Sequence, residues 1–299
     1  MNYSYRSKLF FLVIISILAV SISPLISNHL TNVGFITKSF WRMSIASSLM
    51  WILSYKLKKN YLGFWDNIKV FIAGSLLGLH FVLFYGAIDI LRETGGVNQI
   101  SNATVLGTLA PVFVLIIEKF IFNKKFSAIT FISLGIALTG SLLIFYSDLS
   151  FNSDLFIGNL YAILCSILLS ITFIISTEIR KKIDTITFSR LLYTSAAIVC
   201  FVGLLFSDDT FIDFSKNEFY MLALLGIVPT LFGHNIFYYL VGHLSPVIVS
   251  AIPLAEPIVS TLLSVIIFNL VIPTQTTIIG GLFTIFGLSF LIYSQSENQ

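Results

Sequence analysis

The sequence predicts an all-α integral membrane protein in which ten transmembrane helices form two inverted five-helix repeats. Three observations lead to this prediction: the scarcity of charged residues, ten apolar runs of membrane-spanning length, and an internal repeat. Hydrophobic residues make up 57% of the 299 residues and charged residues only 10%, and the mean hydropathy is +0.95. Ordinary soluble domains carry about 25% charged residues. Because so few charges cannot cover a soluble surface, lipid must be the solvent for most of this chain.

Each predicted helix corresponds to one apolar run. A helix rises 1.5 Å per residue, so about 20 residues cross a hydrocarbon core of about 30 Å. The connections between the runs are short, and we expect no appended soluble domain. The first run follows Arg6 and Lys8, as in a signal peptide, but it lacks a small-residue cleavage site and is expected to be a retained helix. The ten runs are Lys8–Ser27, Phe35–Tyr55, Lys69–Asp89, Val97–Phe122, Phe126–Tyr146, Leu155–Thr177, Phe188–Phe206, Phe219–Leu240, Pro246–Phe268 and Gln275–Tyr293.

The distribution of basic residues predicts the orientation. Lysines and arginines gather in the N-terminal segment and in the connections after the second, fourth and sixth runs. The opposite connections hold Arg92 and Lys216 and are otherwise acidic, with Asp208 and Asp209 among their carboxylates. Cytoplasmic loops carry an excess of Lys and Arg. The pattern therefore predicts a multi-pass protein of the bacterial inner (plasma) membrane with both termini in the cytoplasm.

An internal repeat divides the chain into residues 1–147 and 148–299. Two intervals of twelve residues recur in both parts, and a His-x-x-x-aromatic-Tyr pattern lies upstream of each. Because five helices are an odd number, the second repeat must cross the membrane in the opposite sense, a plan that recurs in secondary transporters. The matched positions are Pro111, Asn123 and Gly135 in the first part and Pro257, Asn269 and Gly281 in the second.

These segments together resemble the drug/metabolite transporter superfamily, specifically its EamA-type ten-helix members. The resemblance rests on Phe40-Trp41-Arg42, Gly78-Leu79-His80-Phe81, the stretch from Pro111 to Asn123, Pro229 to Asn235, and Ala255-Glu256-Pro257. The chain departs from the family where the fourth and ninth helices commonly end in Gly-Glu, since Asn123 and Asn269 stand there instead. The resemblance implies secondary transport of small metabolites, often amino acids and related compounds.

Two charged residues are expected at bilayer depth, Glu256 near the midplane and Arg42 about 10 Å below the outer surface, where a charge costs about 2.5–3.5 kcal/mol and so needs a cavity or a partner. Glu256 lies about 15 Å into the ninth run, between Pro253 and Pro257, which predict a kink. It is a candidate proton acceptor or partner for a cationic group, or a structural residue. Arg42 is a candidate for binding a substrate carboxylate, or for an ion pair, with Glu256 as one possible partner. Lys38, one turn before Arg42, is expected to reach the outer headgroups.

Two histidines occupy corresponding places in the repeats. His80 lies about 16 Å into the third run, and His234 occupies the equivalent place beside Asn235. Histidine changes protonation in the physiological range, which suits proton-coupled exchange, although a hydrogen bond to a neighbouring helix explains either residue equally well. Without spaced carboxylate or thiol ligands they make a poor metal site, and we expect no metal.

Further polar and aromatic residues complete the candidate set. The amides at the start of the fourth run either line an entrance or join helices, and the tyrosines either form an aromatic wall for the substrate or pack. These candidates are Asn98, Asn102, Tyr85 and Tyr238.

Other functional classes fit the sequence less well. No Gly-x-x-x-x-Gly-Lys-[Ser/Thr] loop is present, so ATP is not expected to drive transport directly. A channel-like facilitator lacks a filter sequence, and a lipid-modifying enzyme lacks a nucleophile–base pair, but both remain alternatives. We expect no enzymatic activity, no cofactor and, with a net charge of +3, no nucleic acid. The expected partners are a small-molecule substrate, the lipid bilayer and a coupled proton or counter-substrate, for a monomer or homodimer.

Overall fold

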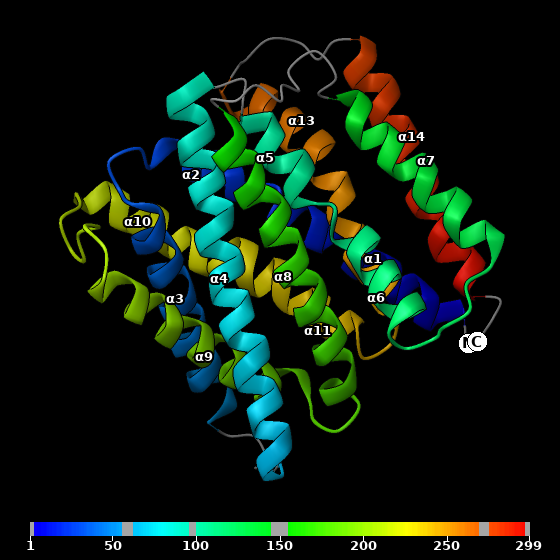
Figure 1. Cartoon of the computed structure of the whole chain (residues 1–299), viewed down its shortest axis with the longest axis horizontal. Helices are drawn as coiled ribbons and strands as arrows, with labels where there is room; N and C mark the ends of the chain where they lie inside the picture. Colours follow the sequence, from blue (N-terminus) through cyan, green and yellow to red (C-terminus); the bar gives the residue numbers. More distant parts are fainter. Residues whose placement is uncertain (1–2, 56–61, 96–99, 145–154, 269–274, 297–299) are drawn as a thin grey trace.

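The computed structural model describes residues 3–55, 62–95, 100–144, 155–268 and 275–296, and every regular element within these ranges is helical (Figure 1). The first part contains α1 (Tyr3–Val20), α2 (Ser23–His29), α3 (Phe35–Ser54), α4 (Phe64–Gly95), α5 (Ile100–Gly107), α6 (Ala110–Phe120) and α7 (Ala128–Ile144). The second contains α8 (Phe156–Arg180), α9 (Thr185–Leu205), α10 (Lys216–Leu225), a π-helix (Gly226–His234), α11 (Asn235–Leu240), α12 (Pro246–Ala251), a 3₁₀ turn (Ile252–Ala255), α13 (Glu256–Phe268) and α14 (Gln275–Ser296).

Eight segments of the described chain are long and apolar enough to cross a membrane, so the prediction of ten spans is confirmed only in part. In α7 the apolar stretch is the shorter Ala128–Leu143. In α3, 20 residues form a helix, but its polar residues lower its mean hydropathy. Several of these polar side chains, such as Lys38 and Arg42, are buried inside the protein and do not face lipid. The eight segments are Ser7–His29, Phe64–Thr94, Asn102–Phe120, Phe156–Arg180, Thr185–Leu205, Lys216–Leu240, Pro246–Ile266 and Gln275–Tyr293.

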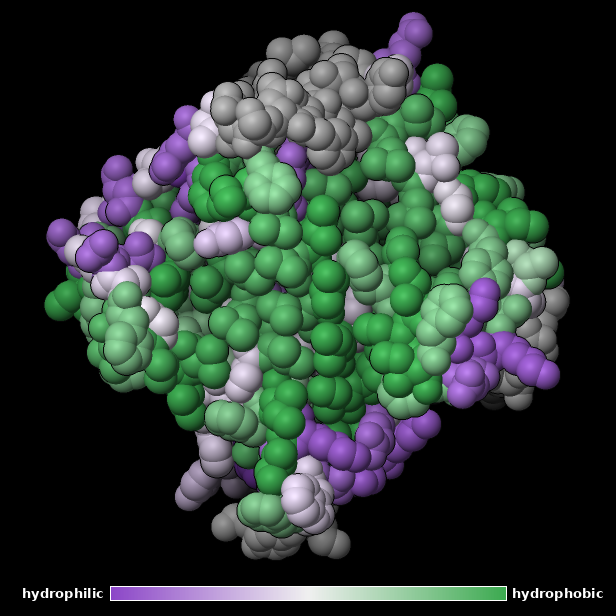
Figure 2. All heavy atoms as spheres, viewed as in Figure 1, coloured by the Kyte–Doolittle hydropathy of each residue, from purple (hydrophilic) through white to green (hydrophobic). Residues whose placement is uncertain are grey.

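The surface of the bundle is apolar, as lipid requires. Large hydrophobic side chains such as Trp51, Phe206 and Phe286 are exposed. Figure 2 shows hydrophobic residues across the middle of one face, with hydrophilic residues gathered toward its margins. A soluble protein would not expose a continuous apolar surface of this kind, so the described fold is that of a multi-pass membrane protein.

Helices far apart in the sequence pack closely at small residues. In Figure 1, α4 and α8 run side by side through the middle, α3 and α9 lie to one side, and α7 with α14 forms a pair at the other. Gly78 on α4 brings its backbone against α9, where an added Cβ would lie 2.7 Å from the Ala196 carbonyl oxygen. Small residues at such contacts let membrane helices approach closely enough for dispersion to hold them together.

Four of the membrane segments are interrupted, and prolines accompany each interruption. Segment Ser7–His29 breaks between α1 and α2 near Pro24, and segment Asn102–Phe120 breaks between α5 and α6, one turn from Pro111. Segment Lys216–Leu240 passes into a π-helix that contains Pro229, and segment Pro246–Ile266 contains a 3₁₀ turn with Pro253. Proline removes a backbone donor and displaces the preceding turn. Irregular backbone at membrane depth is tolerated only where protein or a cavity satisfies its polar groups.

Candidate functional site

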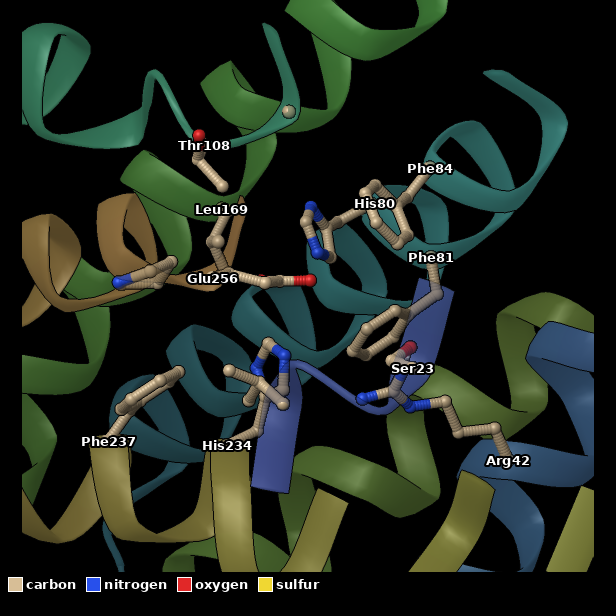
Figure 3. Close-up of a pocket in the computed structure, with 13 residues that line it drawn as sticks. Ser23, Arg42, His80, Phe81, Phe84, Thr108, Leu169, His234, Phe237 and Glu256 are labelled. Atoms are coloured by element: carbon tan, nitrogen blue, oxygen red, sulfur yellow. Dashed lines mark hydrogen bonds between the residues drawn. The ribbon is translucent and has the colours of Figure 1, made fainter. Parts of the chain in front are cut away.

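A small enclosed cavity lies where the interrupted segments meet (Figure 3). Its free volume is about 30 Å³, which is room for roughly one water molecule. We call it the central cavity. Interrupted helices are typical of transporter binding sites, and two of these interruptions, between α5 and α6 and between α12 and α13, lie in spans that correspond in the predicted repeats. Residues at or beside the four interruptions line the cavity, among them Val20 and Ser23, Gly107 and Thr108, His234, and Pro253 and Glu256.

Arg42 supplies the positive charge of the cavity and is almost fully buried, with 1% of its surface exposed. Its Nε donates to Thr230 Oγ1 at 2.9 Å, and its Nη1 donates to Ser23 Oγ at 2.8 Å and to the Tyr85 hydroxyl at 2.5 Å. Its Cζ lies 3.9 Å from the centre of the Phe81 ring. Among the described residues, Nη2 has no hydrogen-bond partner. The guanidinium group is therefore held in place with one donor side left for an anion.

His80 and His234 face each other across the cavity, with ring centroids 6.2 Å apart. His80 Nδ1 lies 2.9 Å from the Cys165 carbonyl oxygen. Because a carbonyl can only accept, Nδ1 carries the proton and Nε2 of the neutral ring is an acceptor. His234 Nδ1 is buried and finds no partner in the described part of the chain. The two histidines predicted to be equivalent are thus brought to one cavity.

Glu256 is the first residue of α13 and is 8% exposed. Figure 3 shows its side chain pointing into the space between His80 and His234. The 3₁₀ turn before it confirms the kink predicted from Pro253 and Pro257. An ion pair with Arg42 was one alternative, and it is absent: no carboxylate oxygen of Glu256 lies within 4.0 Å of the guanidinium nitrogens among the ion pairs of the described residues. The cavity therefore holds a guanidinium and a carboxyl group that are not paired to each other.

Other candidates lie outside the lining. Tyr85 is behind the cavity, where its hydroxyl contacts Arg42 and Ser23. Asn102 Nδ2 donates to Asn159 Oδ1 at 3.0 Å and so joins α5 to α8.

The remaining candidates are separated from the cavity or lie beyond the described residues. Asn235 accepts from Ser189 on α9 and does not line the cavity. Tyr238 is fully buried in an aromatic cluster with Phe188 and Tyr193. Asn98 falls outside the described residues. Tyr238 does not line the central cavity, because its ring packs against Phe173 of α8 and Phe188 of α9 although it lies only one turn from His234.

Lys38 was expected to reach the headgroups, and this expectation is wrong. Its side chain is fully buried, and its Nζ donates to both carboxylate oxygens of Asp89, at 2.8 and 2.9 Å. The partner is 51 positions away on α4, where no local pattern could reveal it. Sequence reasoning also missed Ser23 and Thr230, whose hydroxyls orient Arg42; the prolines next to them, Pro24 and Pro229, are the signals that mark these positions.

Comparison with known proteins places this geometry in context. The model of the EamA-like transporter family matches residues 7–146 and again residues 156–293. The chain is similar to UDP-xylose transporter 1 of Arabidopsis thaliana, with 27% identity over 243 residues, which cover 79% of this chain and 61% of that relative. A solved crystal structure aligns with a TM-score of 0.75 at 16% identity, over 97% of this chain and 98% of its own, and shares the fold.

Proposed function

The chain belongs to the EamA-like transporter family, and from this premise we propose that it is a secondary transporter that moves small organic metabolites through the central cavity by alternating access. One observation carries the proposal: Arg42 and Glu256, groups of opposite charge type that form no ion pair among the described residues, converge with two histidines on a cavity beside four interrupted segments. Buried groups of this kind are costly in a membrane unless they have a function.

The chemistry of the cavity favours a zwitterionic substrate such as an amino acid or a related compound. Arg42 Nη2 is placed to donate to a carboxylate, and Glu256 is placed to accept from an ammonium group. The similarity to a UDP-xylose transporter suggests nucleotide sugars as a second candidate. A diphosphate carries more negative charge than the single guanidinium of the cavity would neutralise, which favours the zwitterion.

The size of the cavity supports a mechanism with more than one conformation. Sites for small organic molecules typically measure about 300–1,000 Å³, whereas this cavity offers about 30 Å³. The structure thus corresponds to a closed state, and a substrate needs helices to move apart before it enters. Two repeats of opposite orientation would supply two such openings, one toward each side of the membrane.

The proposed orientation and energy source follow the charge pattern and the lining residues. The basic connections support an orientation in which both termini lie in the cytoplasm, and we assign the protein to the bacterial inner membrane as part of the proposal. Transport would be driven by a proton or by a counter-substrate. Glu256, His80 Nε2 and His234 are groups in the cavity that could take up a proton on one side and release it on the other.

A counterflow screen in proteoliposomes tests the proposal, with amino acids, nucleosides, adenosine-containing metabolites and UDP-xylose as external substrates. We expect saturable exchange of an amino acid or related zwitterion, and its loss in Glu256→Gln and in His80→Ala, with insertion retained. Glu178→Gln is the matched control, because Glu178 is an exposed carboxylate bonded to Lys69 at the surface. Wild-type exchange in both cavity variants would contradict the site, exchange of UDP-xylose alone would replace the substrate class, and non-saturable flux would indicate a channel.

A further inference from the structure

Two polar contacts join α3 to α4, one above the other. Lys38 Nζ binds the Asp89 carboxylate, and one turn deeper the Arg42 guanidinium binds the Tyr85 hydroxyl. The spacing is four residues on both helices, so the contacts lie on the same faces, about 6 Å apart along each helix. Only the deeper contact belongs to the central cavity, through Arg42. The Lys38–Asp89 ion pair therefore lies one helical turn from the contact that borders the central cavity.

A second cavity lies on the other side of this ion pair. It has a volume of about 390 Å³, and its lining includes Asn32, Gly34, Asp89, Glu93, Asp208 and Asp209. We call it the vestibule. Its acidic residues are those that the charge pattern assigns to the side away from the cytoplasm.

The order of residues along both helices places the ion pair between the two cavities. On α3 the order is Gly34 and Phe35 in the vestibule, then Lys38, then Arg42 in the central cavity. On α4 the order is Glu93 and Asp89 in the vestibule, then Tyr85 and the central cavity beyond it. Lys38, with no exposed surface, lies between the residues that line the two cavities.

The connection between α9 and α10 reinforces this closure. Asp209 Oδ2 accepts from the backbone N–H of Ile36 in the first turn of α3, at 2.9 Å. Thr37 Oγ1 donates to the Thr210 carbonyl oxygen at 2.7 Å. A carboxylate at a helix N-terminus is favourable because it satisfies a free N–H and complements the helix dipole. These contacts hold the vestibule wall against the same turn of α3 that carries Lys38.

Asp89 has a second partner that allows the ion pair to open. Arg92 Nη2 lies 3.3 Å from Asp89 Oδ1, and Arg92 Nη1 is buried without a partner among the described residues. If Asp89 releases Lys38, its carboxylate therefore keeps a cation beside it. Removing one member of a buried pair without such compensation is strongly unfavourable.

We propose that the Lys38–Asp89 ion pair is the gate between the vestibule and the central cavity, and that it opens when Asp89 exchanges Lys38 for Arg92. The inference rests on the proposed function, because a gate presupposes that the central cavity is the transport site. In the structure the Lys38–Asp89 ion pair is formed, which corresponds to the closed gate.

Thiol labelling in membrane vesicles of both orientations tests the gate without using a substrate. The background is the full-length chain with Cys165→Ser and Cys200→Ser, which removes both native thiols. Thr108→Cys places the probe in the central cavity, and Asn32→Cys, at an exposed vestibule residue, reports which side of the vesicle the vestibule faces. A membrane-impermeant maleimide is added outside, and the labelling rate is measured.

We expect Asp89→Asn to raise the labelling rate of Thr108→Cys by at least about tenfold, because Lys38 is left as a buried unpaired charge that favours the open state. The increase is expected only from the vestibule side. The double variant Lys38→Met/Asp89→Leu replaces the ion pair by an apolar contact and should return the rate to that of the background.

Glu178→Gln is the matched control, since it breaks the exposed pair with Lys69 at the other end of α4 and should leave the rate unchanged. An unchanged rate in Asp89→Asn overturns the proposal. So does an equal increase from both sides, which indicates a loosened bundle, or a double variant that stays open. A failed counterflow screen together with gated labelling would overturn the proposed function and leave the barrier standing.

Discussion

Arg42 shows how a buried cation is kept ready for a ligand. Three hydroxyl groups, from Ser23, Tyr85 and Thr230, accept its Nε and Nη1 protons, and Phe81 covers its face. A planar guanidinium held at two nitrogens cannot rotate, so Nη2 keeps one direction. Lysine would bring a charge but not this fixed fork. The orientation of Arg42 therefore depends on the hydroxyl groups that accept its protons.

Thr230→Val tests this dependence, because valine keeps the shape of threonine and removes the oxygen that accepts from Arg42 Nε. Hydrogen bonds to charged groups contribute about 1.5–3 kcal/mol, so we expect the apparent KM for a carboxylate substrate to rise about 10- to 150-fold. The maximal rate should change less. Counterflow at varied substrate concentration gives both values.

Thr230→Ser, which retains the hydroxyl, is the control for this substitution and should keep a KM near that of the wild type. An amine analogue that lacks the carboxylate should inhibit counterflow equally well in Thr230→Val and in the wild type, because it does not bind Arg42. Equal losses for both ligands would show that Thr230 supports the fold rather than the guanidinium.

At the scale of single elements, the interrupted helices determine where chemistry can occur. The kink beside Glu256 was predictable, because Pro253 and Pro257 lie within one run. The π-helix at Gly226–His234 was not, since one proline does not specify which hydrogen-bond pattern replaces the α-helix. It places Thr230 and His234 in the cavity region together, four residues apart, with Thr230 bonded to the Leu225 carbonyl five residues earlier.

Close helix contact is a second property of elements, and it predicts opposite effects for one substitution at two glycines. An added Cβ at Gly78 meets the backbone of Ala196, which cannot move aside, so Gly78→Ala should destabilise the protein by about 1–3 kcal/mol. At Gly135 on α7 an added Cβ meets nothing within 4 Å, so Gly135→Ala should stabilise the helix by about 0.4–1 kcal/mol.

Apparent melting temperatures in detergent, measured by thermal unfolding of the purified variants, check both effects. A lower melting temperature for Gly78→Ala and an unchanged or higher one for Gly135→Ala is the expected result. Equal shifts in the two variants would show that α4 and α9 are not packed through Gly78.

At the scale of the whole molecule, the sequence predicted the membrane-embedded helical class and left the tertiary pairings unknown. Composition and the length of the apolar runs were sufficient to predict this class, because the hydrocarbon core of a bilayer requires apolar helical segments of spanning length. His80 and His234 share a cavity, which their equivalent depths suggested. Lys38 could not be placed correctly, since its distance from the membrane surface was known and its partner Asp89 was not.

Alternating access requires the α9–α10 connection and α3 to move apart, and a disulfide between them tests this requirement. The vestibule wall and the start of α3 meet where an added Cβ on Gly34 would overlap the Asp209 carboxyl group. Replacement of both residues by cysteine therefore puts two Cβ atoms close to each other, and a disulfide needs them about 3.5–4.5 Å apart. The resulting Gly34→Cys/Asp209→Cys bridge would fix the α9–α10 connection to α3 and hold this face closed.

A transporter that must expose its site to both sides in turn should lose exchange when this bridge is oxidised and regain it on reduction. Binding from the basic face should persist, because that opening uses other contacts. Counterflow and equilibrium binding are measured on the same proteoliposomes, before and after reduction, in the Cys165→Ser/Cys200→Ser background. Each single cysteine variant should exchange normally under oxidation. Full exchange with the bridge quantitatively formed would mean that the substrate does not pass the vestibule, and the two openings would then have to be sought elsewhere in the bundle.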